Sequence, residues 1–268
     1  MIGLLGFLAG LLIGSFLNVC VFRLPRDLSV VAPRSFCPGC ERMIAWYDNI
    51  PVLSFLLLRG RCRHCQARIP WRYPAVELAT AAIFTVIGAS LGLTLAAAKY
   101  AIFSAILIAL IATDFEERIL PDEFTLGGTV VGLVLAWFLP LDPELGLLFV
   151  PYRAGQRWLS LTDSAIGAVV ASGAIWLLAF VYEKLRHREG MGLGDVKMIA
   201  MIGAFLGLRQ ALVTMIVAST VGAVGGLIFI FAARKKASEY ELPFGSFLGL
   251  SALGVAMVGE VLAPWLHR

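Results

Sequence analysis

Charged residues are scarce in this sequence and make up only 15% of its 268 residues. A soluble domain usually carries about a quarter charged residues. Here hydrophobic residues reach 59%, with a mean hydropathy of +0.86. The shortage of charge excludes an ordinary soluble domain and predicts an all-α polytopic membrane protein. The sequence also lacks a basic helix face, and its formal charge is only +4, so nucleic acid is not an expected partner.

The sequence also does not predict a secretory signal peptide. The first apolar run has no basic segment before it and no small-residue cleavage site after it, so we interpret it as a true membrane span. Runs near or above the roughly 18–20 residues needed to cross a bilayer recur along the chain. They fall at about 1–22, 75–95, 98–113, 124–140, 163–182, 197–208, 211–232 and 246–265. We predict about eight transmembrane helices, with a tight turn at "LRQ" before the seventh and with glycines that allow close packing.

If the predicted spans cross the membrane in alternating directions, most lysine and arginine residues fall on one side of it. Seventeen of the 22 fall in four segments, 23–74, 114–123, 183–197 and 233–245. The positive-inside rule therefore places these segments in the cytoplasm and both termini in the periplasm. We expect the basic residues to contact anionic membrane lipids.

The only substantial polar segment, 23–74, contains two Cys-x-x-Cys pairs. They are "CPGC" and "CRHC", which supply Cys37, Cys40, Cys62 and Cys65. Two residues between thiolates let both sulfurs reach one tetrahedral ion, so this spacing predicts a small zinc-ribbon-like domain with a structural Zn²⁺. Two disulfides or a thioredoxin-like redox site are competing interpretations, and a reducing cytoplasm disfavours disulfides.

Two acids stand at the predicted cytoplasmic ends of spans. Asp114 ends the third apolar run and Asp195 opens the sixth, so topology places them at one depth although they are 81 residues apart. Two carboxylates brought together in a site of low dielectric share a proton, as in aspartic proteases. Gly192 and Gly194 leave room for a substrate backbone beside Asp195. Taken singly, Asp195 could instead be a helix N-cap and Asp114 a solvated span end.

These residues carry a family resemblance. "GMGLGDVK" (190–197) resembles the G-x-G-D motif of membrane-embedded aspartyl peptidases, and "TDFEERILPDEFT" (113–125) resembles its partner motif. Four further segments are similar to the type IV prepilin peptidases and occur in the same order along nearly the whole chain. They are "GSFLNVCVFRLPR" (14–26), the double Cys-x-x-Cys segment, "RYPAVELATA" (72–81) and "ELPFGSFLGL" (241–250).

The resemblance implies a bifunctional enzyme of the bacterial inner membrane. Such an enzyme cleaves the basic leader of prepilins and pseudopilins, the subunits of type IV pili and type II secretion systems, on the cytoplasmic side. It then N-methylates the new N-terminal residue, commonly Phe, with S-adenosyl-L-methionine. By motif position, the resemblance implies that Asp114 and Asp195 form the catalytic pair and that Asp122 is a supporting motif residue.

The resemblance also implies a division into three parts. A first helix (1–22) precedes the tetracysteine domain (23–74), which is linked to the methyltransferase branch, and a seven-helix peptidase domain (75–268) follows. No nucleotide-binding motif is recognisable. Glu77 is a candidate for contact with the methyl donor or with the substrate amine, and it could instead be only an acid at a helix start. Two alternatives remain open: a membrane scaffold that docks partners through its zinc ribbon, and a G-x-G-D protease that cuts within spans and has no methyltransferase activity.

Overall fold

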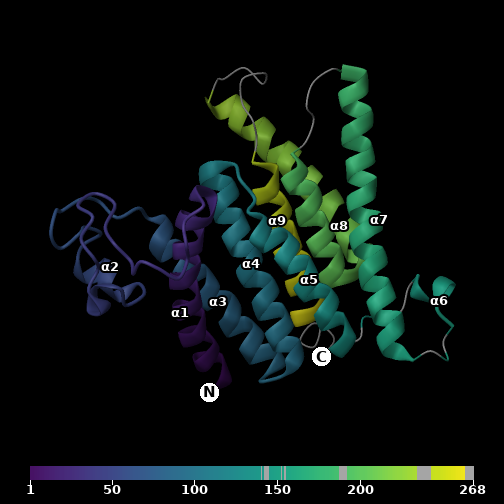
Figure 1. Cartoon of the computed structure of the whole chain (residues 1–268), viewed down its shortest axis with the longest axis horizontal. Coiled ribbons are helices and arrows are strands. Elements are labelled where there is room, and N and C mark those ends of the chain that lie inside the picture. The colour runs from purple at the N-terminus through teal and green to yellow at the C-terminus, as the bar shows by residue number, and fades with distance from the viewer. Residues whose placement is uncertain are drawn as a thin grey trace. The chain divides into compact units, whose positions relative to one another are not determined.

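The computed structural model is built from helices (Figure 1). It describes residues 1–139, 141, 145–151, 153, 155–186, 192–233 and 243–262. Within these ranges the only β structure is two isolated bridges. The chain divides into two compact units, one formed by Met1–Thr113 with the chain end from Val261, and one formed by Asp114–Glu260. The all-α membrane fold predicted from composition is therefore confirmed.

The first unit is built around α1 (Ile2–Arg23) and α3 (Arg72–Leu91), which lie side by side (Figure 1). Their contact depends on glycines of α1. A Cβ atom at Gly10 would lie 2.5 Å from the Cα of Ala81, and one at Gly14 would lie 2.7 Å from the Cα of Glu77. Only a residue without a side chain fits so close a backbone approach, which confirms the packing role predicted for glycine in the first run.

The segment between α1 and α3 contains η1 (Leu24–Arg26), η2 (Trp46–Asp48) and the short α2 (Leu53–Leu57). Two buried charged side chains anchor it to the helices. Arg23 at the end of α1 donates hydrogen bonds to the carbonyl oxygens of Ser29 (2.7 Å) and Pro33 (2.6 Å). Glu77 of α3 accepts a 2.7 Å hydrogen bond from the Val52 amide. The polar segment is therefore held by both helices rather than by a core of its own.

The second unit follows α4 (Leu95–Glu117), whose last turn belongs to it. It contains α5 (Asp122–Phe138), α6 (Gly146–Phe149), α7 (Gln156–Arg186), α8 (Leu193–Ala233) and α9 (Phe244–Ala256), which continues as a π-helical turn, Met257–Val261. The backbones of α7 and α8 nearly touch, since a Cβ atom at Gly203 would lie 2.2 Å from the carbonyl oxygen of Gly167.

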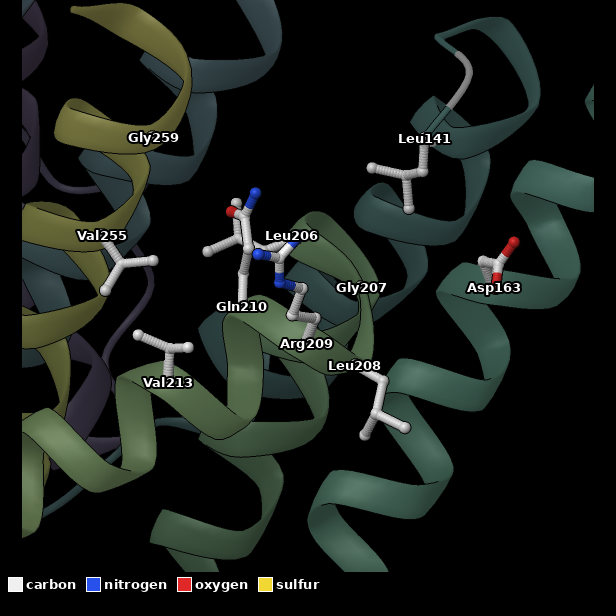
Figure 2. Close-up of a pocket in the computed structure, with 10 residues that line it drawn as sticks. All are labelled: Leu141, Asp163, Leu206, Gly207, Leu208, Arg209, Gln210, Val213, Val255 and Gly259. Atoms are coloured by element: carbon white, nitrogen blue, oxygen red, sulfur yellow. The ribbon is translucent and has the colours of Figure 1, made fainter. Parts of the chain in front are cut away.

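The long helix α8 is interrupted at Gly207, whose φ of 81° and ψ of 173° are not helical. Figure 2 shows the chain bending through Gly207 and Leu208 between two helical stretches. The break lies directly before the predicted "LRQ" turn and separates the sixth and seventh apolar runs as expected.

The predicted count of eight membrane helices is not confirmed. Within the described residues, five helices are long and apolar enough to cross a membrane: Ile2–Arg26, Arg72–Leu91, Leu95–Glu117, Gln156–Arg186 and Leu193–Ile228. The count falls because the two runs on either side of the Gly207 break count as one helix, while α5 has only 17 residues and α9 only 13. The last predicted run extends to 265, and its final residues lie outside the described part of the chain.

Candidate active site and metal centre

Asp114 lies near the end of α4 and is only 6% exposed. One of its carboxylate oxygens, Oδ2, accepts two hydrogen bonds from Ser246 in the first turn of α9. The Ser246 backbone amide donates at 2.6 Å and its hydroxyl at 2.7 Å. The buried carboxylate therefore has partners that neutralise the cost of removing it from water.

Two glycines permit this close assembly. A Cβ atom at Gly245 would lie 3.0 Å from the Asp114 Cγ, and a Cβ atom at Gly194 would lie 3.2 Å from the Leu120 Cβ. The starts of α9 and α8 therefore both pack against the segment 114–120. At Gly192 the nearest atoms are 3.9 Å away, and one of them is Oδ2 of Asp195, so this glycine leaves space beside the second acid.

Asp195 is the third residue of α8 and is half-buried. The charge of Asp114 acts on it, so folding brings two acids that are 81 residues apart in the sequence within range of each other's charge. Its place within the first turn is not that of an N-cap residue, which precedes the helix. Carboxylates are favoured in the first turn because the unsatisfied amides there carry partial positive charge.

Asp122 occupies a different environment at the start of α5. Its carboxylate forms an ion pair with the Lys197 ammonium, with Nζ at 2.7 Å from Oδ1 and 2.9 Å from Oδ2. The two side chains are 55% and 35% exposed. Asp122 therefore links the start of α5 to Lys197, the fifth residue of α8, through a solvated ion pair.

The four cysteines of the polar segment meet at one point. The sulfur atoms of Cys37, Cys40, Cys62 and Cys65 all lie within 4.8 Å of one another. The Cys37 and Cys65 sulfurs are 3.7 Å apart, close to the separation of about 3.8 Å that a tetrahedral ion with Zn–S bonds of about 2.3 Å requires. All four are free thiols. The cluster can therefore hold a metal ion.

The two cysteine pairs have the same local backbone structure. An antiparallel bridge joins Phe36 to Met43 around the first pair and Arg61 to Arg68 around the second. The residue after each pair, Glu41 or Gln66, has a positive φ, of 57° and 60°. The segment thus contains two equivalent turns 25 residues apart, each supplying two thiols.

Backbone amides point toward the sulfurs in these turns. The Cys65 amide and then the His64 amide lower the pKa of the Cys62 thiol to about 7. Burial raises the pKa of Cys37. A turn that stabilises thiolate is suited to a metal, because thiolate rather than thiol is the ligand.

The first unit contains a cavity of about 410 Å³. Ser15, which interacts with the Glu77 carboxylate, belongs to the lining of this cavity, whereas Glu77 itself does not. The other lining residues include Phe16, Arg23, Arg34, Trp46 and Asn49. Contact between Glu77 and a methyl donor stays a prediction.

A second cavity, of about 420 Å³, lies at the α8 break (Figure 2). Its lining includes Leu206, Arg209 and Asp163. Leu206 lies 11 residues after Asp195 along α8, roughly 16 Å at 1.5 Å per residue. This cavity is therefore separate from the aspartate pair.

Three polar residues with clear roles were not singled out from the sequence. They are Ser246, Arg23 and Asp163, whose buried carboxylate accepts hydrogen bonds from the amides of Leu145 (2.8 Å) and Gly146 (2.7 Å). Each is a polar residue in or beside an apolar run. Such residues are expensive in a membrane, so their position was a signal that could have marked them.

Comparison with known proteins gives two family matches that together span most of the chain. Residues 8–91 match the bacterial peptidase A24 N-terminal domain, and residues 101–227 match the type IV leader peptidase family.

Three similar proteins carry the name prepilin leader peptidase/N-methyltransferase. The protein from Aeromonas hydrophila is 34% identical over 97% of this chain and 91% of its own length. The one from Pseudomonas aeruginosa is 33% identical over 94% and 89%. The Myxococcus xanthus protein is 37% identical over 88% of this chain, which spans 65% of that relative's length. No solved structure matches the chain.

Proposed function

The chain belongs to the type IV leader peptidase family, and we propose that it cleaves the leaders of type IV prepilins with Asp114 and Asp195 as its catalytic pair. The observation that carries this proposal is that Asp195 of α8 lies within range of the charge of Asp114 of α4, near the ends of two helices that could cross a membrane. A non-enzymatic scaffold has no need to bring two acids within range of each other, so this interaction supports the protease.

The pair supplies both functions that peptide hydrolysis requires. One carboxylate takes a proton from water, whose oxygen attacks the scissile carbonyl carbon, while the protonated partner donates to the carbonyl oxygen. Collapse of the tetrahedral intermediate breaks the C–N bond, and the leaving amine receives a proton. Because the site is partly buried, these charges interact in a medium of lower dielectric than water.

The membrane setting fits a prepilin substrate. A prepilin carries a long apolar helix that lies in the bilayer, so its leader junction lies at the interface. If eight segments cross the membrane in alternation, the bias of lysine and arginine toward segments such as 23–74 and 183–197 supports a cytoplasmic position for this junction and periplasmic termini. The enzyme then works in the inner membrane in contact with anionic lipids.

Cleavage by purified full-length enzyme in lipid nanodiscs tests the proposal. Asp114→Asn and Asp195→Asn should each abolish release of the leader, whereas Asp122→Asn should cleave at close to the native rate. Full activity in either of the first two variants contradicts the assignment. Mass spectrometry of the product separates leader cleavage from a cut inside the membrane helix.

The metal held by the four cysteines is structural Zn²⁺ in this proposal. Four thiolates fill a tetrahedral site and leave no position for a substrate, which is typical of structural rather than catalytic zinc. The polar segment has few buried apolar side chains, so a metal would supply much of its folding free energy.

The second activity, N-methylation, uses S-adenosyl-L-methionine, for which the cavity in the first unit is the best available site. Its volume of about 410 Å³ lies within the range of about 300–1,000 Å³ typical of small-molecule sites. The Trp46 ring can stack on adenine and contact the sulfonium cation, and the exposed Arg34 can pair with the carboxylate. When bound, the donor supplies a methyl group activated by its positive sulfur.

The same cavity extends along α1 from Leu12 to Arg23, roughly 16 Å at 1.5 Å per residue. Its α1 end is lined by Leu12, Phe16 and Val19. An apolar side chain such as Phe at the N-terminus of a cleaved pilin would find a matching surface there. Donor and acceptor could therefore meet in one cavity.

Equilibrium binding of radiolabelled S-adenosyl-L-methionine tests this site without requiring turnover. Trp46→Ala should weaken binding at least tenfold. Trp71→Ala is the matched control, because Trp71 is equally exposed in the same segment but does not line the cavity. Equal binding by both variants would exclude the cavity and leave the peptidase assignment intact.

A further inference from the structure

Ser246 makes two contacts with the same carboxylate oxygen of Asp114. The backbone amide lies 2.6 Å and the hydroxyl 2.7 Å from Oδ2, and both residues are about 5% exposed. The amide is closer to this oxygen than to the Pro243 carbonyl, which lies 3.2 Å away. Asp114 thereby occupies the place of a capping acceptor at the start of α9, a helix of 13 residues.

We propose that Ser246 is a positioning residue that fixes the orientation of the Asp114 carboxylate in the catalytic pair. This inference rests on the proposed peptidase function and names a third residue for the same site. It is carried by the two hydrogen bonds from Ser246 to Oδ2 of Asp114.

The argument is geometric. Oδ2 of Asp114 is engaged by both the Ser246 amide and the Ser246 hydroxyl, and rotation of the carboxylate would break both bonds. The other oxygen, Oδ1, is therefore held in one orientation and is the oxygen left to exchange a proton during hydrolysis.

Close packing around Ser246 holds its backbone amide against Asp114. Gly245 leaves no room for a side chain, since its Cβ atom would lie 3.0 Å from the Asp114 Cγ and 3.1 Å from Leu120 Cδ1. The α9 backbone is therefore pressed against the acid, which places the Ser246 amide on it. The hydroxyl adds the second bond, and it is the only one of the two that a substitution can remove.

Steady-state kinetics of prepilin cleavage by the full chain in nanodiscs tests the proposal. Ser246→Ala should lower kcat about tenfold with KM unchanged, because a hydrogen bond to a charged group is lost while the amide bond remains. Ser246→Thr keeps a hydroxyl and should restore most of kcat. Ser251→Ala is the matched control, because Ser251 is also a buried serine of α9.

The outcomes are distinguishable. A fall in kcat for Ser246→Ala that Ser246→Thr reverses, at a melting temperature equal to that of Ser251→Ala, supports the assignment. Equal kcat in Ser246→Ala and Ser251→Ala overturns it, as does a loss of kcat matched by a fall in melting temperature. Cleavage by Asp114→Asn would instead overturn the proposed function itself.

Discussion

The cysteine cluster and the aspartate pair each use only a few side chains, but these side chains are separated by very different numbers of residues along the sequence. All four thiols lie within 28 residues of one another, and two equivalent turns present them. The aspartate site joins Asp114 to residues 81 and 132 positions away. The first site depends on local turns, while the second depends on the packing of three helices.

This difference decides what disturbs each site. A local site with a bound metal is insensitive to the packing of distant helices, but it fails when one ligand is lost. A site assembled by helix packing has no metal–ligand bonds to hold it together, so a single added methyl group between the helices can displace its side chains. The two sites should therefore respond independently to substitutions.

The largest effect is expected from removal of an acid. Asp195→Asn should lower kcat/KM for leader cleavage by about 10⁴-fold, and the Asp114→Asn/Asp195→Asn double variant should be no slower, because the two act as a unit. Zinc measured by elemental analysis should stay at one per chain in both. A double variant much slower than the singles would show that the acids act separately.

Removal of one thiol should disrupt the metal site and leave leader cleavage nearly unchanged. Cys65→Ser should release the metal, since a structural zinc site loses much of its binding free energy of about 10–16 kcal/mol when a ligand is missing. S-adenosyl-L-methionine binding should fall with it, while leader cleavage should change less than about tenfold, because the pair belongs to another compact unit. Cys20→Ser, a buried thiol of α1 outside the cluster, is the control and should keep its zinc.

A methyl group at Gly245 tests the dependence on helix packing. Gly245→Ala should lower kcat by about 10²-fold, because the new Cβ would lie 3.0 Å from the Asp114 Cγ and must move the acid or the helix. Gly127→Ala adds the same group in α5, where nothing lies within 4 Å, and should leave kcat unchanged. Equal rates for the two variants would contradict the close packing at α9.

The smallest effect is expected at the exposed ion pair. Asp122→Asn or Lys197→Met should change the free energy of unfolding by less than about 1 kcal/mol, since solvent screens pairs of this kind. Leader cleavage should stay within about threefold of the native rate. A loss approaching that of Asp195→Asn would mean that Asp122, not Asp114, is the partner of Asp195.

Most of the helices could be predicted because apolar runs directly reflect membrane burial. Their ends could not, since polar residues also extend helices beyond the membrane. The run at 163–182 became α7 (Gln156–Arg186), for example. The cysteine cluster followed from spacing alone, because the turns are local. The contact of Asp114 with Ser246 could not be predicted, since no sequence pattern specifies which helix start lies against a buried acid 132 residues away.

The backbone contact between Gly167 and Gly203 limits how the site can move. A Cβ atom at Gly203 would lie only 2.2 Å from the carbonyl oxygen of Gly167, so sliding α8 along α7 would bring a residue with a side chain into a space that fits none. We therefore expect α7 and the first half of α8, which carries Asp195, to move together when a substrate helix enters.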